Sequence, residues 1–244
     1  MSDTKRKVVL SLYDFTGEAL KPWAQAGYEC YAFDIQHDSM LIETYEGGGS
    51  IHYVRADLHE PKTFTMLLNQ FHPDELAFGM AFPVCTDMAV SGAAHFASKL
   101  KADPEFQTKA VTYATMCADF FDALKVPYFI ENPVSVLATK WRKPNYTFHP
   151  YLYGGYIPLC QAEHPEWPQY IAPRDAYKKK TCLWTGNEFV MPTFRPVSCE
   201  AYHGNGYATA MMKLGGKSMR TKNIRSATPR GFARAVYEAN HGTE

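Results

Sequence analysis

The chain opens with a strand–turn–helix–strand pattern, and this feature constrains its fold more than any other. An apolar run at 8–13 predicts a buried strand, and a turn follows at 14–17. Residues 18–26 then have a helical pattern, which Gly27 closes, and a second strand is expected at 28–34. A β-turn-α-turn-β unit of about thirty residues is the building block of a parallel, doubly wound α/β sheet.

This rhythm continues as far as residue 131 and is then lost. Further strands are expected at 51–56, 76–82 and 128–131, and helices at 63–71 and 104–124. Residues 141–178 are rich in proline and aromatic residues and have little periodicity, which is typical of an inserted lobe. We therefore expect a Rossmann-like α/β fold with a mostly parallel sheet, divided into a core (1–140), a small lobe (141–178) and a return to the core (179–244) that contains a strand at 180–184 and a terminal helix at 228–239.

Composition excludes several classes of protein. With 244 residues, 46% of them apolar and 20% charged, the chain is expected to be globular. A formal net charge of zero argues against a wholly basic nucleic-acid binder but leaves local patches open. Its six cysteines lack any CxxC spacing, which favours reduced thiols in the cytoplasm over a disulfide scaffold. No run has the apolar length of a signal peptide core or of a membrane span, so we expect no membrane partner.

A cysteine and a glutamate stand at the ends of neighbouring expected strands. Cys85 follows the apolar run 76–82 and Pro83, and Glu131 ends the next strand, with Asn132 after it. Open α/β folds bind ligands at the carboxyl ends of their strands. There, a thiol that attacks a ring carbon and a carboxyl group that protonates a nearby nitrogen would act together. The bland alternative is a buried, inert thiol, but the polar loop around Cys85 favours reactivity.

Acidic residues end three successive strands in the first half of the chain. Asp14 opens the first turn, in which Gly17 permits a close approach of backbone to ligand. Asp34 could accept hydrogen bonds from ribose hydroxyls, and Asp57 from an adenine amino group. Each could be an ordinary polar strand end, but three in succession favour a nucleotide cofactor. The expected cofactor site thus includes Asp14, Phe15, Thr16, Gly17, Asp34, Ile35, Asp57 and Leu58.

A basic stretch lies near the carboxyl end of the sequence. Residues 203–236 contain seven lysines and arginines and no acidic residue. Such a run is often only a solvated face, but the glycines and hydroxyl side chains beside these charges favour contact with nucleic-acid phosphates. Aromatic residues at 141–184 could stack on bases or form the lobe's own core. Cys160 and His164 lack a second pair of ligands, so no metal site is expected.

As a set, these motifs resemble the DNA cytosine-C5 methyltransferases, most closely small forms found in phages and their hosts. The resemblance covers nearly the whole chain, in the family's motif order and at compatible spacing. The matching segments are Asp14-Phe-Thr-Gly17 (first cofactor motif), Asp34 and Asp57 (acidic positions), Pro83-Val-Cys85 (the Pro-Pro-Cys loop), Glu131-Asn-Pro133 (the Glu-Asn-Val motif), Lys178 and Lys180 (an Arg-x-Arg strand near the target base) and the helix from Thr228 (closure of the cofactor pocket).

The resemblance implies a mechanism. The target cytosine flips out of the DNA duplex, because its C5 and C6 atoms are inaccessible inside the stack. Cys85 adds to C6 while Glu131, held by Asn132, protonates N3, and C5 then takes a methyl group from S-adenosylmethionine. Family members that act on RNA typically place the catalytic cysteine beside the fifth strand. Here the end of the fifth strand carries Glu131 and no cysteine, so the resemblance favours DNA as the substrate.

Three departures from the family pattern widen the choice of function. Gly17-Glu18-Ala19 replaces Gly-x-Gly with Lys21 nearby, Val84 replaces the second proline, and lysines Lys178 and Lys180 replace arginines. The altered charge near the donor motivates a second hypothesis, in which carboxy-S-adenosylmethionine meets Lys21 or Lys178 and the product is 5-carboxymethylcytosine. Two further functions stay open: a non-catalytic module that binds nucleotide or DNA, and a C5 enzyme that acts on free pyrimidine nucleotides.

Overall fold

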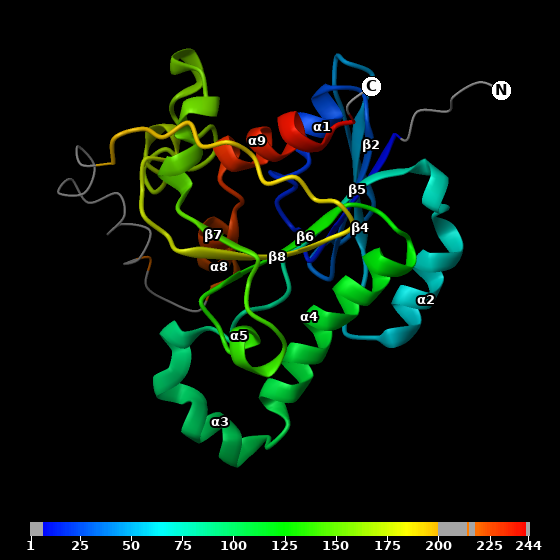
Figure 1. The fold of residues 1–244 in the computed structure, drawn as a ribbon, viewed down its shortest axis with the longest axis vertical. Coiled ribbons are helices and arrows are strands. Elements are labelled where there is room, and N and C mark those ends of the chain that lie inside the picture. The colour runs from blue at the N-terminus through cyan, green and yellow to red at the C-terminus, as the bar shows by residue number, and fades with distance from the viewer. Residues whose placement is uncertain (1–6, 200–213, 215–217, 243–244) are drawn as a thin grey trace. The chain divides into compact units, whose positions relative to one another are not determined.

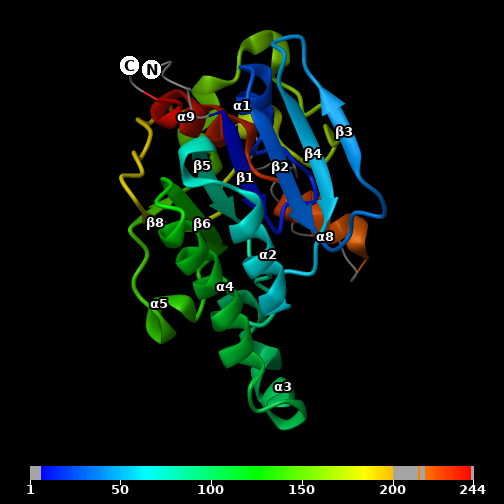
Figure 2. The same ribbon diagram turned by 90° about the vertical axis from the view of Figure 1, so that its right-hand side faces the viewer.

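The computed structural model describes residues 7–199, 214 and 218–242. The strands among these residues are β1 (Val8–Leu12), β2 (Glu29–Asp34), β3 (Leu41–Thr44), β4 (Ser50–Arg55), β5 (Leu76–Ala81), β6 (Tyr128–Pro133), β7 (Tyr146–Phe148) and β8 (Thr181–Gly186). They form one sheet in the order β3-β4-β2-β1-β5-β6-β8-β7 (Figure 1). The run from β4 to β6 is parallel, whereas β3 pairs with β4 and β8 with β6 in the antiparallel sense. Figure 2 looks onto β1, β2 and β4, with β3 at the edge.

Helices cover both faces of this sheet. The α-helices described in the whole chain, whichever part of it they belong to, are α1 (Lys21–Gln25), α2 (Pro61–Gln70), α3 (Phe96–Ala102), α4 (Phe106–Ala123), α5 (Leu137–Lys140), α8 (Met219–Ser226) and α9 (Arg230–Asn240). On one face, Phe64 of α2 and Phe121 of α4 pack with Leu12 of β1 in one apolar cluster. On the other face, Trp23 of α1 stacks on Phe78 of β5, with ring centroids 5.1 Å apart. Burial on both faces explains why the central strands are continuous apolar runs.

The predicted α/β class is confirmed: the sheet is mostly parallel and flanked by helices, an arrangement compatible with a Rossmann-like fold. The strands expected at 8–13, 28–34, 51–56 and 76–82 are β1, β2, β4 and β5. Strands β1 and β5 were recognisable because nearly all their side chains are buried, so the apolar run is almost unbroken, whereas β4 alternates between buried and partly buried side chains.

Several elements differ from the sequence prediction, and the short elements α3, α5 and β7 were not predicted at all. The helix expected at 18–26 begins only at Lys21, because a proline in the second helical position is accepted in a first turn but not in a helix interior. Strand β6 continues past residue 131 to Pro133, since β8 pairs with it along its whole length. Strand β3 was not predicted, because its side chains are mostly exposed and carry no apolar pattern. Helix α8 was not predicted, because its residues are almost wholly polar.

The chain forms two compact units, each made of separate segments. The first unit comprises Met1–Thr147, Thr181–Phe189 and Asn240–Glu244, and the second comprises Phe148–Lys180 and Val190–Ala239. The parallel strands belong to the first unit. The second unit holds α8 and nearly all of α9, and has its own apolar cluster around Ile171, Tyr177 and Ala227. The inserted lobe expected at 141–178 overlaps the first segment of the second unit.

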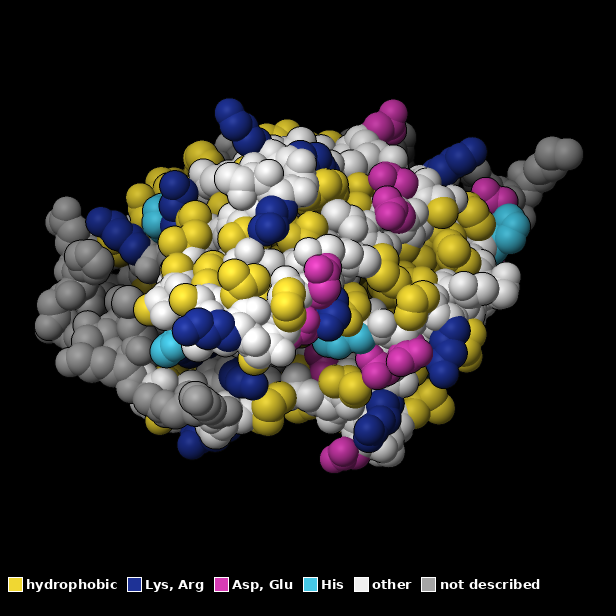
Figure 3. Space-filling view, turned by 90° about the horizontal axis from the view of Figure 1, so that it is seen from below, with side chains coloured by type: hydrophobic (Ala, Val, Ile, Leu, Met, Phe, Trp, Pro, Cys, Tyr) yellow, Lys and Arg dark blue, Asp and Glu magenta, His cyan; other side chains and the backbone are white. Residues whose placement is uncertain are grey.

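One face of the molecule is drawn with its side chains coloured by type in Figure 3. On the face drawn in Figure 3, acidic and basic side chains are interspersed with apolar ones. None of the helices in the described ranges is long and apolar enough to cross a membrane.

Candidate functional site

The order of the strands reverses between β1 and β5. From β1 the chain moves outward to β2 and β4, and it then returns past β1 to β5 and β6. Leu12, Ala81 and Ile130 lie level with one another in the three neighbouring strands. In open α/β sheets, such a reversal leaves a crevice outside the carboxyl ends of the strands, where ligands bind. The loops that follow these three residues are therefore the candidate site.

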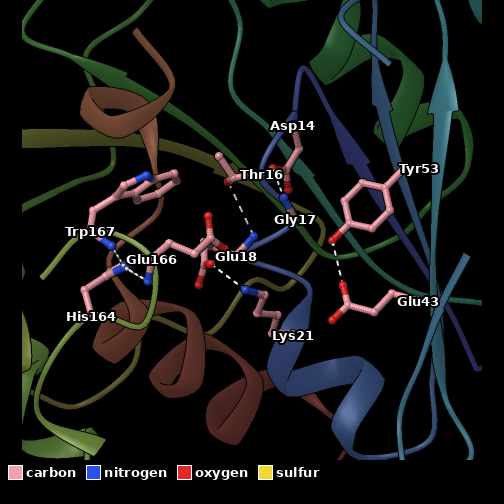
Figure 4. A network of polar contacts seen from close by, with 10 residues as sticks. All are labelled: Asp14, Thr16, Gly17, Glu18, Lys21, Glu43, Tyr53, His164, Glu166 and Trp167. Atoms are coloured by element: carbon pink, nitrogen blue, oxygen red, sulfur yellow. Dashed lines mark hydrogen bonds and ion pairs between the residues drawn. The ribbon is translucent and has the colours of Figure 1, made fainter. Parts of the chain in front are cut away.

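Asp14 organises the loop after β1. Its buried carboxylate accepts a hydrogen bond from Ser11 Oγ at 2.7 Å and another from Gly17 N at 2.8 Å. Burial raises the pKa of Asp14, and these two hydrogen bonds oppose that shift. Gly17 has a φ of +66°, and a Cβ atom there would lie 2.6 Å from Tyr53 Oη on β4. The loop is thus a tight turn packed directly against Tyr53 (Figure 4).

The side chains after Asp14 include an exposed aromatic ring and an ion pair between Glu18 and Lys21. Phe15 is 38% exposed and stacks on His37, with ring centroids 5.4 Å apart. Thr16 Oγ1 accepts a hydrogen bond from Glu18 N at 3.5 Å, and Lys21 Nζ lies 2.6 Å from Glu18 Oε1 (Figure 4). Glu18 is buried, and its carboxylate and the ammonium group of Lys21 neutralise each other within the same turn.

The two other acidic strand ends also shape their own loops. Asp34 Oδ1 accepts the backbone N–H of residue 36 at 2.8 Å, and Asp57 Oδ1 accepts that of residue 59 at 3.0 Å. Asp34 is buried and Asp57 is exposed. Ile35 is 52% exposed beside Asp34, whereas Leu58 is buried and its carbonyl accepts the hydroxyl of Tyr13 at 2.9 Å. The carboxyl end of β2 therefore presents a carboxylate next to an exposed isoleucine.

The loop after β5 carries Cys85 and is attached to the end of β6. Asn132 is only 1% exposed, and its Nδ2 donates a hydrogen bond to Pro83 O at 2.9 Å. The carbonyl of Cys85 accepts the backbone N–H groups of Met88 at 3.0 Å and Ala89 at 2.8 Å. The thiol thus lies on a closed turn, and the asparagine predicted to hold the site connects that turn to the neighbouring strand.

A second set of backbone contacts joins the same two segments. Val90 N donates to Val134 O and Val136 N donates to Met88 O, each at 3.0 Å, and residues 89 and 135 form an isolated β-bridge. Glu131 precedes this ladder within β6, directly after Ile130, and is partly buried. The loop that carries Pro83 and Cys85 is therefore attached to the end of the strand that carries Glu131 and Asn132.

Lys99 of α3 is a contributor to this loop that the sequence did not predict. Its Nζ donates to Asp87 Oδ1 at 2.6 Å and to Thr86 O at 2.9 Å, so it holds the two residues that follow Cys85. The partners are 12 and 13 residues apart in sequence and belong to no periodic pattern, so only the structure reveals the contact.

Among the described cysteines, Cys85 and Cys160 are the two that are not buried. Burial raises the pKa values of Cys30 and Cys117, which keeps these thiols protonated and unreactive. Cys160 is exposed but belongs to the second unit, whereas the parallel strands belong to the first. Cys85 is therefore the thiol to consider for chemistry at the candidate site.

The remaining predicted residues belong to the second unit. Lys178 and Lys180 are exposed, and Lys179 between them donates from Nζ to Arg225 O at 3.0 Å. Thr228 is buried two residues before α9 begins. No sequence pattern indicated His149, whose pKa is lowered by burial and then by the charges of Lys178 and Lys180.

Neither a protein-family model nor a curated protein sequence matches the chain. Within the described ranges, no group of three or more His, Cys, Asp or Glu side chains is arranged to hold a metal ion.

Proposed function

We propose that the protein is a DNA cytosine-C5 methyltransferase that acts in the cytoplasm of a bacterial or phage-infected cell. The proposal depends on one observation above all: the buried Asn132 side chain donates to Pro83 O at 2.9 Å. This bond connects the strand that carries Glu131 to the turn that carries Cys85. A nucleophile and a proton donor that serve the same ring must be held in fixed relation, and this contact supplies that relation.

The carboxyl ends of β1, β2 and β4 suit the adenosine part of S-adenosylmethionine. Asp34 offers a carboxylate for ribose hydroxyls, and exposed Phe15 and Ile35 offer apolar surface for a purine ring. Asp14, Thr16, Gly17, Asp57, Leu58 and Pro83 would complete this site. When bound, S-adenosylmethionine supplies an electrophilic methyl group.

The protein's own side chains perform the remaining steps. The Cys85 thiolate adds to C6 of a flipped cytosine and forms a carbon–sulfur bond, while the Glu131 carboxyl group gives its proton to N3. This addition makes C5 nucleophilic. After C5 has gained the new group, water takes the C5 proton, the electron pair of that bond restores the C5–C6 double bond, and the carbon–sulfur bond breaks to return Cys85 as a thiolate. N3 then gives its proton back to Glu131.

The ion pair of Lys21 favours a plain methyl group over a carboxymethyl group. A carboxylated donor would need a cation to meet its carboxylate. Lys21 Nζ already lies 2.6 Å from the buried carboxylate of Glu18. Removing it from that partner would leave a buried charge uncompensated, which is costly. We therefore propose S-adenosylmethionine as the donor, and 5-carboxymethylcytosine remains the second candidate product.

Nucleoside mass spectrometry on DNA from cells that express the chain tests the proposal. We expect a methylated cytosine in the wild type and in Cys160→Ser, which removes the exposed thiol outside the site. The adduct should be absent in Cys85→Ala and strongly reduced in Glu131→Gln. A carboxymethyl adduct would instead identify the carboxylated donor.

Two outcomes would reject the proposal in favour of a different function. Unmodified DNA with folded, expressed protein, together with modification of free cytidine nucleotides by the purified protein, would favour the nucleotide-level enzyme. DNA binding that Cys85→Ala leaves unchanged, with no modified base from either substrate, would favour the non-catalytic module.

A further inference from the structure

The charges of this neutral chain are divided unequally between its two units. The second unit contains twelve lysines and arginines but only five aspartates and glutamates, whereas the first contains thirteen and twenty. One of the five acidic residues, Asp175, is buried and accepts the backbone N–H of Gly231 at 2.8 Å. The second unit is thus strongly basic although the whole chain is not, and polyanions are its natural partners.

Within the second unit, two segments that carry basic residues run side by side. Tyr151 N donates to Tyr177 O at 3.3 Å, which places the residues around 149 beside those around 178. Lys178 and Lys180 are both exposed, as expected for alternate residues of a chain segment without helical turns. The His149 ring stacks on Tyr151, with ring centroids 6.0 Å apart. This stacking holds the imidazole against a residue of the same segment, beside the segment that carries the two lysines.

We infer that His149, Lys178 and Lys180 form a seat for a phosphate group of duplex DNA, and that His149 takes up a proton when the phosphate binds. The inference rests on the proposed function for its choice of DNA as the polyanion. In this proposal Lys178 and Lys180 contact a phosphate of the DNA backbone. His149 is a further contact that no sequence motif or pattern indicates.

The charges around His149 explain why its imidazole would take up a proton when a phosphate binds. Burial lowers the pKa of His149, and the charges of Lys178 and Lys180 lower it further, while a backbone hydrogen bond with Lys179 opposes them. These groups are the charged and polar neighbours that act on the imidazole. A phosphate placed among them offsets the two positive charges and favours the protonated ring. Binding therefore raises the pKa of His149, and affinity increases as the pH falls.

Helix α8 extends the same basic surface. Its residues Arg220, Lys222 and Arg225 are exposed, and no acidic residue occurs in the helix. Lys179 Nζ donates to Arg225 O, so the last turn of α8 is attached to the segment that carries the seat. A phosphate in the seat would thus have further cations nearby for the neighbouring phosphates of the same duplex.

The test measures binding of the full-length protein to a fluorescent DNA duplex by anisotropy, across salt concentration and pH. We expect Lys178→Gln and Lys180→Gln each to reduce the slope of log affinity against log salt, and the double variant to reduce it by about 0.9, the value for one lost phosphate contact. Lys62→Gln, an exposed lysine of the first unit, is the matched control and should leave the slope unchanged.

The pH series tests His149 separately. Wild-type affinity should rise between about pH 7.5 and about pH 5.5, by up to about tenfold per pH unit for one proton. His149→Gln should abolish that rise and retain the affinity measured at the higher pH, whereas His72→Gln, an exposed histidine of the first unit, should keep the rise. Circular dichroism confirms that each variant is folded.

The outcomes separate this inference from the proposed function. Slopes for Lys178→Gln and Lys180→Gln equal to that of Lys62→Gln, or an unchanged pH profile in His149→Gln, would overturn the phosphate seat even if the protein methylates DNA. Failure of the wild type to bind duplex DNA would overturn both. Binding of polyglutamate as tight as that of DNA, with the same variant effects, would show a general anion site and overturn the assignment to DNA.

Discussion

Replacing Asn132 by alanine should release the turn that carries Cys85. The change removes the 2.9 Å hydrogen bond to Pro83 O and leaves a carbonyl at a buried position without that donor. Losing one partner of a buried hydrogen bond costs about 1–3 kcal/mol. If this energy holds the turn closed, the open population rises by about 5- to 150-fold. The amide groups of Met88 and Ala89, which donate to Cys85 O, should exchange with solvent faster by that factor.

Amide hydrogen exchange followed by mass spectrometry or NMR measures this factor directly. Asn187→Gly is the matched control, because Asn187 Nδ2 donates to Phe121 O and Val126 O, each at 3.1 Å, at the opposite end of β6. Glycine also tolerates the φ of 51° at this position. The control should lose stability but keep slow exchange at Met88 and Ala89. Identical exchange at these amides in Asn132→Ala and the wild type would refute the argument that Asn132 fixes the turn.

Three further changes test other parts of the structure. Gly17→Ala should lower the free energy of unfolding by about 1–3 kcal/mol, read from the urea midpoint, because its φ is +66° and its Cβ would lie 2.6 Å from Tyr53 Oη; an unchanged midpoint would contradict the close packing. Lys99→Met breaks the partly exposed ion pair with Asp87, so the free energy of unfolding should change by less than about 1 kcal/mol. Amide exchange near Cys85 should become faster in this variant, and Lys99→Arg, which keeps the charge, should retain the wild-type exchange rate. Because the folded state lowers the pKa of His149, the unfolded state binds that proton more readily; thermal stability should fall as the pH drops below about 6.5, and His149→Gln should weaken this dependence.

The parts of the fold that could be predicted are those whose pattern is local. Buried strands such as β1 and β5 are continuous apolar runs, and helix α4 has apolar residues at helical spacing. Strand β3 could not be found, because an edge strand with exposed Leu41 and Ile42 has no inward face to mark it. Helix α8 is almost wholly polar, and its clearest signal is the N-cap Ser218, whose hydroxyl accepts the N–H of Thr221 at 3.2 Å.

The same distinction applies to the candidate site. Cys85, Glu131 and Asn132 stand at strand ends, so their neighbourhood followed from the order of strands. The bond that connects Asn132 to Pro83 spans 49 residues, and the contact of Lys99 with the Cys85 turn spans 12 or 13. Such contacts depend on how distant segments pack and leave no periodic trace. Asp34 and Asp57 gave a partial signal only, because an aspartate that follows a strand serves equally well to cap its own loop.

The interleaving of the two units has a consequence for how the protein is made. The chain passes between them four times, and β8, the neighbour of β6, is translated only after the first segment of the second unit, Phe148–Lys180. While a ribosome is producing that segment, one edge of β6 in the nascent chain has no strand beside it. An open strand edge pairs readily with other chains, so a polypeptide that stops before residue 181 should aggregate rather than fold as a smaller sheet. Neither unit corresponds to a single stretch of the gene, and the sheet is completed only late in translation.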